Sequence, residues 1–363
     1  MKRIPFDPAE IDNAEDVVGF LGMVSKKYKT PITPKENCRL VYERKLPLWL
    51  PLSGDTLMFI PRVDPDNVAR CFCFEANMLK PEELTGGPDK FGIEWVYIPE
   101  AQGSMVRPGN PVLNDANEWK TVIKFPDIET WDWEGSKASN AAYVDTDKFV
   151  SITIMTGFFE RLISLMDFDK AAMAMIDEDQ TDAVHELFEA LADLYIKMID
   201  KFIYCYNIDQ LCIHDDWGSQ RAPFFSLATV REMVVPHLKE LTDYCHSRGI
   251  FVDIHSCGKN EILVPGYIEA GCDSWSGQAI NDKEMLYGLY GDKLIMSIES
   301  GLPFAYGPAG VKIEPEEARA AALRFLGKYG ADYAKKPVLA SGFGAPPEYN
   351  ETLYAESRRA FNS

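Results

Sequence analysis

The chain has 363 residues, of which 46% are hydrophobic and 26% are charged, which is typical of a globular protein with a large core. Acidic side chains outnumber basic ones by 56 to 37, and the resulting charge of -19 repels phosphate backbones and anionic lipids. We therefore expect no nucleic acid and no membrane among its partners. No apolar stretch reaches transmembrane length, and the N-terminus lacks the apolar core of a secretory signal. The eight scattered cysteines predict reduced thiols in a cytoplasmic protein.

Strand and helix patterns alternate along most of the chain. Residues 1–45 form an acidic, partly helical lead-in. Short apolar runs predict eight strands, at residues 46–53, 91–98, 150–155, 208–213, 250–255, 273–277, 294–298 and 337–340. Helical patterns occupy residues 158–176, 180–206, 227–248, 261–270, 281–290, 315–329 and 347–360. Residues 99–148 are too long for a plain connection and predict a folded excursion over a site.

This alternation predicts the α/β class and a single (β/α)8 TIM barrel at residues 46–363. Residues 1–45 precede it as an N-terminal extension, and the long excursion follows strand two. A doubly wound open sheet is the alternative, but the first strand lacks the Gly-x-Gly-x-x-Gly turn of a dinucleotide site. Nothing in the sequence decides between a monomer and a homodimer.

The fifth predicted strand ends in a His-x-Cys pair, His255 and Cys257. Residues two apart on a strand point the same way, so the imidazole and the thiol would aim at one point where the strand ends. Both groups are good ligands for a borderline-soft metal such as zinc. The alternative is a polar strand end with a packed, inert thiol.

Further polar residues follow the carboxyl ends of other strands, which is where a barrel of this kind carries its site. Asp215 and Asp216 are candidate catalytic residues after strand four, with a metal ligand, a general base or a cap for the following helix as open roles. Glu299, after strand seven, is a candidate oxygen ligand or acid/base group, or else a solvated loop carboxylate. The candidate pocket residues are His214, Trp217, Gln220, Gln278 and Glu94.

The segment His214-Asp-Asp-Trp-Gly-Ser-Gln220, with Phe224-Phe-Ser226, resembles a strand-end motif of the uroporphyrinogen decarboxylase superfamily. His255-Ser-Cys-Gly258, Glu269-Ala-Gly-Cys-Asp273 and Tyr290-Gly-Asp-Lys293 continue the resemblance, which covers residues 200–300 well. The resemblance implies a single (β/α)8 barrel.

Two branches of the superfamily imply different activities. Its true decarboxylases bind a highly carboxylated tetrapyrrole through an arginine-rich loop after strand one and an aspartate after strand two. Here strand one ends in Pro51-Leu-Ser-Gly-Asp-Thr56 without an arginine, and Glu94 is only a loose counterpart of the aspartate. The corrinoid-dependent methyltransferases bind zinc through a His-x-Cys pair and a later cysteine. His255 and Cys257 match that pair, whereas the later segment, Leu339-Ala-Ser-Gly-Phe-Gly344, has no cysteine.

The methyltransferase branch is therefore the closer match. It implies zinc on His255 and Cys257, with Glu299 as the preferred third ligand and Gln278 or Asp215 as alternatives. It also implies a corrinoid (cobalamin) carried by a separate protein and a small thiol or methyl-ether substrate. A uroporphyrinogen decarboxylase-like carboxy-lyase and a non-catalytic small-molecule-binding barrel are the alternative functions.

Overall fold

A computed structural model describes residues 3–18, 24–83, 85–99, 103–306, 310–342 and 344–362 of the chain. The chain forms two compact units, each assembled from segments that are distant in sequence. Unit 1 contains residues 1–57, 147–149 and 273–363, and unit 2 contains residues 58–146 and 150–272. The division into a lead-in at residues 1–45 and a barrel at residues 46–363 stays a prediction.

Unit 2 carries three neighbouring parallel strands, β7 (Phe149–Ile154) from Val150 onward, β8 (Gln210–His214) and β9 (Phe251–His255). Every residue of β7 is buried, as expected for a parallel strand whose two faces are both covered. The register sets Ile152 opposite Leu211, so apolar side chains of adjacent strands lie side by side. The third, fourth and fifth predicted strands are therefore confirmed.

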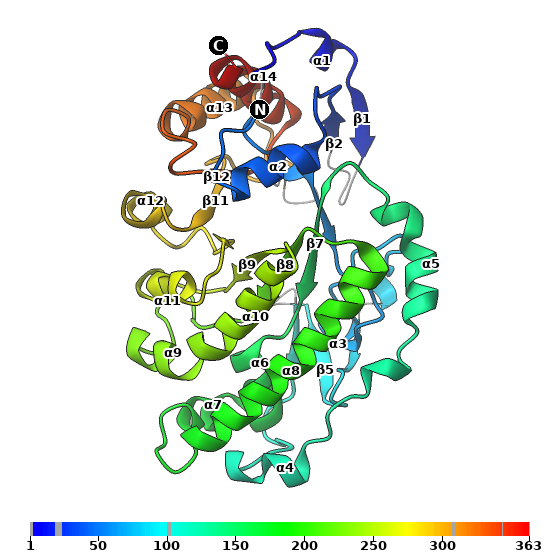
Figure 1. Cartoon of the computed structure of the whole chain (residues 1–363), viewed down its shortest axis with the longest axis vertical. Coiled ribbons are helices and arrows are strands. Elements are labelled where there is room, and N and C mark those ends of the chain that lie inside the picture. The colour runs from blue at the N-terminus through cyan, green and yellow to red at the C-terminus, as the bar shows by residue number, and fades with distance from the viewer. Residues whose placement is uncertain are drawn as a thin grey trace. The chain divides into compact units, whose positions relative to one another are not determined.

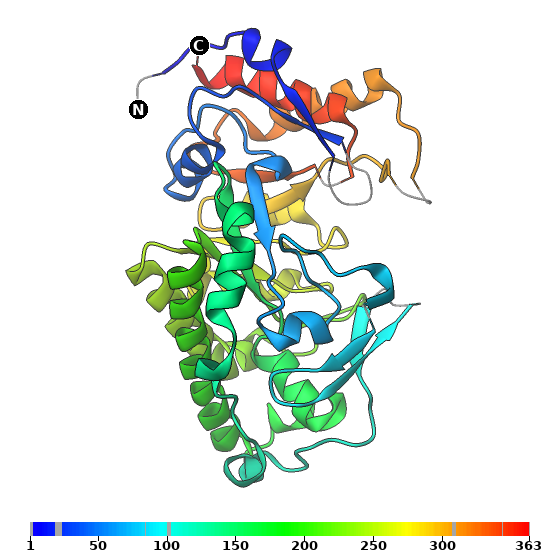
Figure 2. The same ribbon diagram turned by 90° about the vertical axis from the view of Figure 1, so that its right-hand side faces the viewer.

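Helices with one apolar face cover these strands. The 26-residue helix α8 (Thr181–Tyr206) ends at Asn207, whose φ of 49° is the left-handed conformation that commonly closes a helix. It lies beside α5 and α10 (Figures 1 and 2). The other described helices of unit 2 are α3 (Pro65–Ala69), α4 (Trp119–Val122), α5 (Trp133–Val144), α6 (Phe158–Met166), α7 (Phe168–Ala174), α9 (Leu227–Met233), α10 (Val235–Ser247) and α11 (Val264–Glu269).

The helix predicted at residues 158–176 is divided into α6 and α7. Asp167 separates them because its φ of 63° lies in the left-handed region, which an α-helix does not continue through. Its carboxylate accepts the backbone N–H of Gly109 at 2.8 Å. This hydrogen bond connects part of the predicted excursion, at residue 109, to the break between α6 and α7. The excursion is folded, as expected, and includes α4 and α5.

The prediction of a second barrel strand at residues 91–98 is wrong. That run forms β5 (Glu94–Ile98), the middle strand of an antiparallel sheet with β4 (Gly86–Pro88) and β6 (Gly103–Val106). A tight turn joins β4 to β5, with the Gly92 N–H donating to the Asp89 carbonyl at 2.9 Å. So short a connection allows only antiparallel pairing, which an apolar run by itself cannot reveal.

Unit 1 holds three further parallel strands, β10 (Ser274–Trp275), β11 (Ile295–Glu299) and β12 (Val338–Ser341). They confirm the sixth, seventh and eighth predicted strands. Helices α13 and α14 lie side by side in this unit (Figure 2). The remaining elements of unit 1 are α1 (Ala9–Asp12), β1 (Glu15–Val18), β2 (Val24–Lys27), α2 (Pro34–Tyr42), α12 (Lys283–Tyr290), α13 (Pro315–Tyr329) and α14 (Pro347–Asn362).

The first predicted strand, at residues 46–53, is also wrong. The segment is buried but irregular, because Pro47 and Pro51 have no N–H to donate to a ladder. Its backbone is satisfied by side chains instead. The Leu48 N–H donates to Asn37 Oδ1 at 2.8 Å, and the Leu50 N–H donates to Ser357 Oγ at 3.0 Å. The strand in this part of the chain is β3 (Thr56–Phe59), which begins a few residues later.

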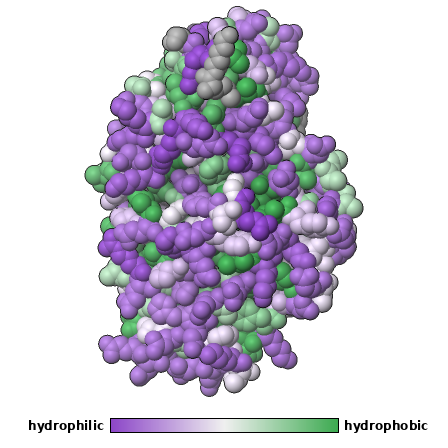
Figure 3. Space-filling model, in the orientation of Figure 1, coloured by the Kyte–Doolittle hydropathy of each residue, from purple (hydrophilic) through white to green (hydrophobic). Residues whose placement is uncertain are grey.

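Parallel strands alternating with helices confirm the α/β class, while the closed eight-stranded barrel stays a prediction. None of the described helices is long and apolar enough to cross a membrane. The face of the molecule in Figure 3 is mainly hydrophilic, with smaller hydrophobic areas.

Candidate functional site

The candidate site lies in unit 2, at the carboxyl ends of β8 and β9. The parallel register sets His214 opposite His255 at the last position of each strand. Because side chains at paired positions point to the same face of a sheet, the two imidazoles stack, with centroids 4.8 Å apart and planes at 21°. Two histidines that are distant in sequence are thus brought together by strand pairing.

Four half-buried residues form the site: His214, Asp216, His255 and Cys257. One ligand atom from each lies within 4.8 Å of the others, and no other such group of three or more His, Cys, Asp or Glu residues occurs in the described parts of the chain. His255 Nε2 is 3.3 Å from Cys257 Sγ. Asp216 Oδ1 accepts the backbone N–H of Cys257 at 2.6 Å, which joins the loop after β8 to the loop after β9. We call these residues the four-residue cluster.

The donor set of the four-residue cluster suits zinc. Two imidazoles, one carboxylate and one thiolate are its usual ligands, and bonds of about 2.0–2.3 Å place tetrahedral donors roughly 3.3–3.8 Å apart. The separation of 3.3 Å between His255 and Cys257 already falls in that range. Burial, and then the Asp216 carboxylate, raise the pKa of the Cys257 thiol above its usual value. A cation at this point would have the opposite effect and favour the thiolate.

His214 is held by Glu160, a residue of α6. His214 Nδ1 lies 2.8 Å from Glu160 Oε2, and Arg70 Nη1 donates to Glu160 Oε1 at 2.8 Å. Burial alone would raise the pKa of Glu160, but Arg70 and then His214 outweigh it and lower that pKa to about 2. Burial alone would lower the pKa of His214, but the Glu160 carboxylate outweighs it and raises that pKa.

Asp215 is not part of the four-residue cluster and instead caps a helix. Its carboxylate accepts the backbone N–H groups of Phe158, Phe159 and Glu160 at 2.8–3.1 Å. This cap belongs to α6, which follows β7, and not to the helix that follows β8. Burial, and then the charge of Glu160, raise the pKa of Asp215 to about 6. Of the three roles left open for Asp215, helix capping is the one that the geometry favours.

Replacing Asp215 with alanine is expected to lower the free energy of unfolding by about 2 kcal/mol or more, because three buried N–H groups lose their acceptor. Chemical denaturation of the variant checks this value. Asp177→Ala is the control: that carboxylate accepts N–H groups of Asp179 and Gln180 but is only half-buried. An equal, small loss in both variants would contradict the capping role.

The remaining predicted pocket residues of unit 2 lie outside the four-residue cluster. Trp217 is only 1% exposed and packs on Tyr267 with ring centroids 5.0 Å apart, which is the position of a core residue. Gln220 is exposed in the turn that follows. Glu94 is exposed at the start of β5. None of these three placements adds support to a role in substrate binding.

Two predicted site residues, Glu299 and Gln278, belong to unit 1. Glu299 ends β11 and forms an ion pair with Lys283 at 2.5 Å. The backbone carbonyl of Gln278 accepts the side-chain N–H of Asn281 at 2.9 Å. Their proposed parts in metal or substrate binding stay predictions.

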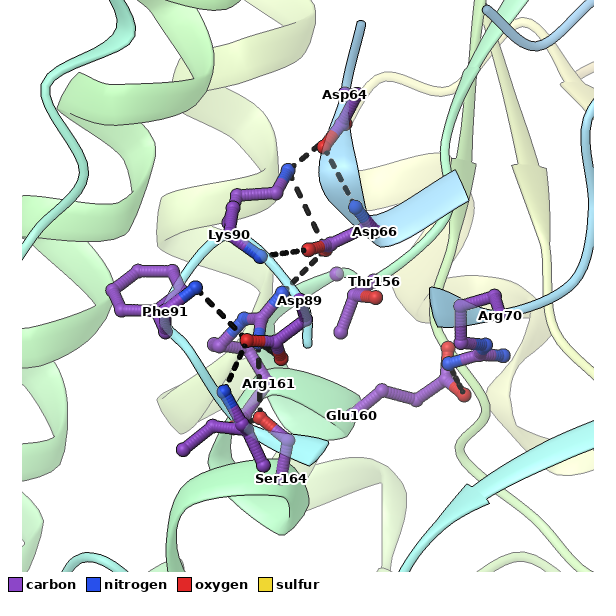
Figure 4. A network of polar contacts seen from close by, with 12 residues as sticks. Asp64, Asp66, Arg70, Asp89, Lys90, Phe91, Thr156, Glu160, Arg161 and Ser164 are labelled. Carbon is purple, nitrogen blue, oxygen red and sulfur yellow. Dashed lines mark hydrogen bonds and ion pairs between the residues drawn. The ribbon is translucent and has the colours of Figure 1, made fainter. Parts of the chain in front are cut away.

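Sequence reasoning missed Arg70 and Glu160. The available signal was the charged pair Glu160-Arg161 inside the otherwise apolar residues 149–166. Figure 4 shows why both charges are tolerated there: Glu160 lies against Arg70, and Arg161 points toward Asp66 and Asp89.

A family model described as Uroporphyrinogen decarboxylase (URO-D) matches residues 96–296, more than half of the chain. Among solved structures, a methyltransferase from Methanosarcina mazei has a TM-score of 0.60 at 15% identity and covers 92% of this chain and 100% of its own. A Group IV chitinase from Ostrinia furnacalis has a TM-score of 0.36 at 10% identity, covering 66% of this chain and 87% of its own. No curated protein matches the chain. The structural likeness to the methyltransferase shows a shared fold.

Proposed function

Because the chain belongs to the uroporphyrinogen decarboxylase family, we propose that it is an enzyme of that family's methyltransferase branch. The proposed reaction moves a methyl group between a corrinoid, carried by a separate protein, and a small thiol or methyl-ether substrate. The proposal includes a bound zinc ion and the closed (β/α)8 barrel that the family implies. The four-residue cluster is the single observation that carries it.

The electrostatics of the site support this branch over the decarboxylases. A highly carboxylated substrate needs free cations, but Asp216 and Glu160 both place carboxylates at the four-residue cluster. The Arg70 guanidinium already donates to Glu160, the residue that contacts His214, and the Arg70 side chain is 11% exposed. The Asp216 carboxylate adds a second negative charge. Such surroundings attract a cation and repel carboxylates.

Cys257, His255 and Asp216 would hold the zinc ion, with His214 as a fourth donor that substrate binding can replace. When bound, zinc supplies a Lewis acid that favours a substrate thiolate near neutral pH or polarises the oxygen of a methyl ether. The chain itself orients these donors. The Cys257 N–H donates to Asp216, and Glu160 accepts from His214, so two of the four side chains are fixed by further hydrogen bonds.

Elemental analysis of protein purified without a histidine tag tests the proposal. We expect about one equivalent of zinc per chain, since one such site is proposed, and loss of that zinc in Cys257→Ala. Cys205→Ala is the control, because Cys205 is also a mostly buried thiol but lies at the end of α8 beside Trp133. A wild-type protein that takes up no zinc would overturn the proposal.

A methyl-transfer assay then tests the reaction. Free methylcobalamin with a small thiol examines one direction, and Co(I) cobalamin with an aryl methyl ether examines the other, both followed by the cobalamin absorbance. We expect turnover in at least one direction and its loss in Cys257→Ala. The carboxy-lyase alternative would be established if the protein instead removes carboxyl groups from a porphyrinogen and Cys257→Ala keeps full activity in that reaction.

A further inference from the structure

Glu160 is attached at two points to the segment that carries His214 and Asp216. Its backbone N–H donates to Asp215 Oδ1 at 2.8 Å, and its carboxylate lies 2.8 Å from His214 Nδ1. The first turn of α6 and the end of β8 therefore hold each other through both the backbone and the side chain of Glu160. The side chain is only 11% exposed, so water does not compete well for these bonds.

The hydrogen-bond partners of Glu160 decide which nitrogen of His214 carries a hydrogen. Arg70 can only donate, and it occupies Oε1. An ionised carboxylate can only accept, so the contact at Oε2 requires a hydrogen on His214 Nδ1. In the neutral imidazole the lone pair then lies on Nε2. Stacking on His255 further limits the orientation of the ring.

We infer that Glu160 is a positioning residue whose hydrogen bond from His214 Nδ1 holds the imidazole in the tautomer and orientation that leave Nε2 free for a cation at the four-residue cluster. The inference rests on the proposed function for the identity of that cation. Carboxylates that accept from the second nitrogen of a metal-binding histidine are a recurrent arrangement. Arg70 holds the carboxylate in place and itself lies over the Trp95 ring, with Cζ 4.7 Å from the ring centroid.

The first test is the tautomer of His214 in metal-free protein, measured by ¹⁵N NMR of histidine-labelled protein at a pH where the ring is neutral. The chain has five histidines, and the His214→Gln variant identifies the signal. We expect the Nδ1–H tautomer in the wild type. Glu160→Gln should shift it toward Nε2–H, because Arg70 retains the single carbonyl oxygen and the amide N–H₂ faces Nδ1. A wild-type Nε2–H tautomer would refute the inference, and this result does not depend on zinc.

The second test is zinc affinity, measured by competition with a chromophoric chelator. Glu160→Gln is expected to weaken zinc binding by about 10–100-fold while its capacity stays at one equivalent. Adding Arg70→Met to Glu160→Gln should recover part of the loss, since the carbonyl oxygen becomes available to His214. The control is Glu75→Gln, which alters another buried glutamate with an arginine partner.

These outcomes separate the inference from the proposed function. If the wild type binds zinc and Glu160→Gln binds it equally well, Glu160 is not a positioning residue, while the proposed function stands. Equal weakening in Glu75→Gln would show a general loss of stability and would also overturn the inference. If the wild type shows the Nδ1–H tautomer but takes up no zinc, the proposed function fails while the positioning of His214 stands.

Discussion

Replacing Arg161 with methionine is expected to lower the free energy of unfolding of unit 2 by about 3–5 kcal/mol. The Arg161 side chain is 0% exposed and forms ion pairs with Asp66 and Asp89, and it also donates to Ser164 Oγ (Figure 4). Methionine fills similar space but leaves two buried carboxylates without that partner. Burial would raise the pKa of Asp66, but Arg161 and then Lys90 outweigh it and lower that pKa.

Hydrogen exchange of peptides from α6 and β7 measures this loss directly in unit 2. Arg231→Met is the matched control, because Arg231 also pairs with a carboxylate, Glu269, but at an exposed position, where about 0–1 kcal/mol is expected. Adding Asp66→Asn and Asp89→Asn to Arg161→Met should recover part of the stability, since the unpaired charges are removed. Equal losses of stability for Arg161→Met and Arg231→Met would contradict the prediction that burial makes the loss of an arginine partner more destabilising.

Replacing Asp216 with asparagine is expected to weaken zinc binding on the order of 100-fold or more. This loss exceeds the one expected for Glu160→Gln, because Asp216 would contact the metal directly. Asparagine can still accept the Cys257 N–H through its carbonyl oxygen, so the loop after β9 should keep its position. It removes the anionic oxygen that would bind the zinc ion. The variant therefore isolates the metal-binding role of Asp216 from its structural one, and chelator competition measures the result.

Glu299→Gln is the informative comparison, since the sequence pattern made Glu299 the preferred third ligand. In the structure Glu299 is paired with Lys283 within unit 1. If Asp216 is the carboxylate ligand, Glu299→Gln should bind zinc as the wild type does. Loss of zinc in Glu299→Gln together with full binding in Asp216→Asn would restore Glu299 as the ligand and remove Asp216 from the site.

Local patterns determined much of the fold and one half of the site. Six of the predicted strands are present as parallel strands, because short β-branched and apolar runs between amphipathic helices leave few alternatives. His255 and Cys257 were paired from the two-residue period of a strand, which depends only on neighbouring residues. The turn at residues 89–93 and the prolines at 47 and 51 show the limit of such patterns: an apolar run indicates burial but does not identify the strand with which it pairs.

What the sequence determined by itself is therefore the alternation of strands and helices and the His-x-Cys pair at the end of one strand. Only the tertiary structure decided that His214 stacks on His255 and that Asp215 caps α6. It also decided that Glu160 accepts hydrogen bonds from both His214 and Arg70. These contacts join residues 54 to 90 positions apart in all but the histidine pair, whose separation is 41. Their physical cause is strand register and helix docking, which no periodicity within a single segment records.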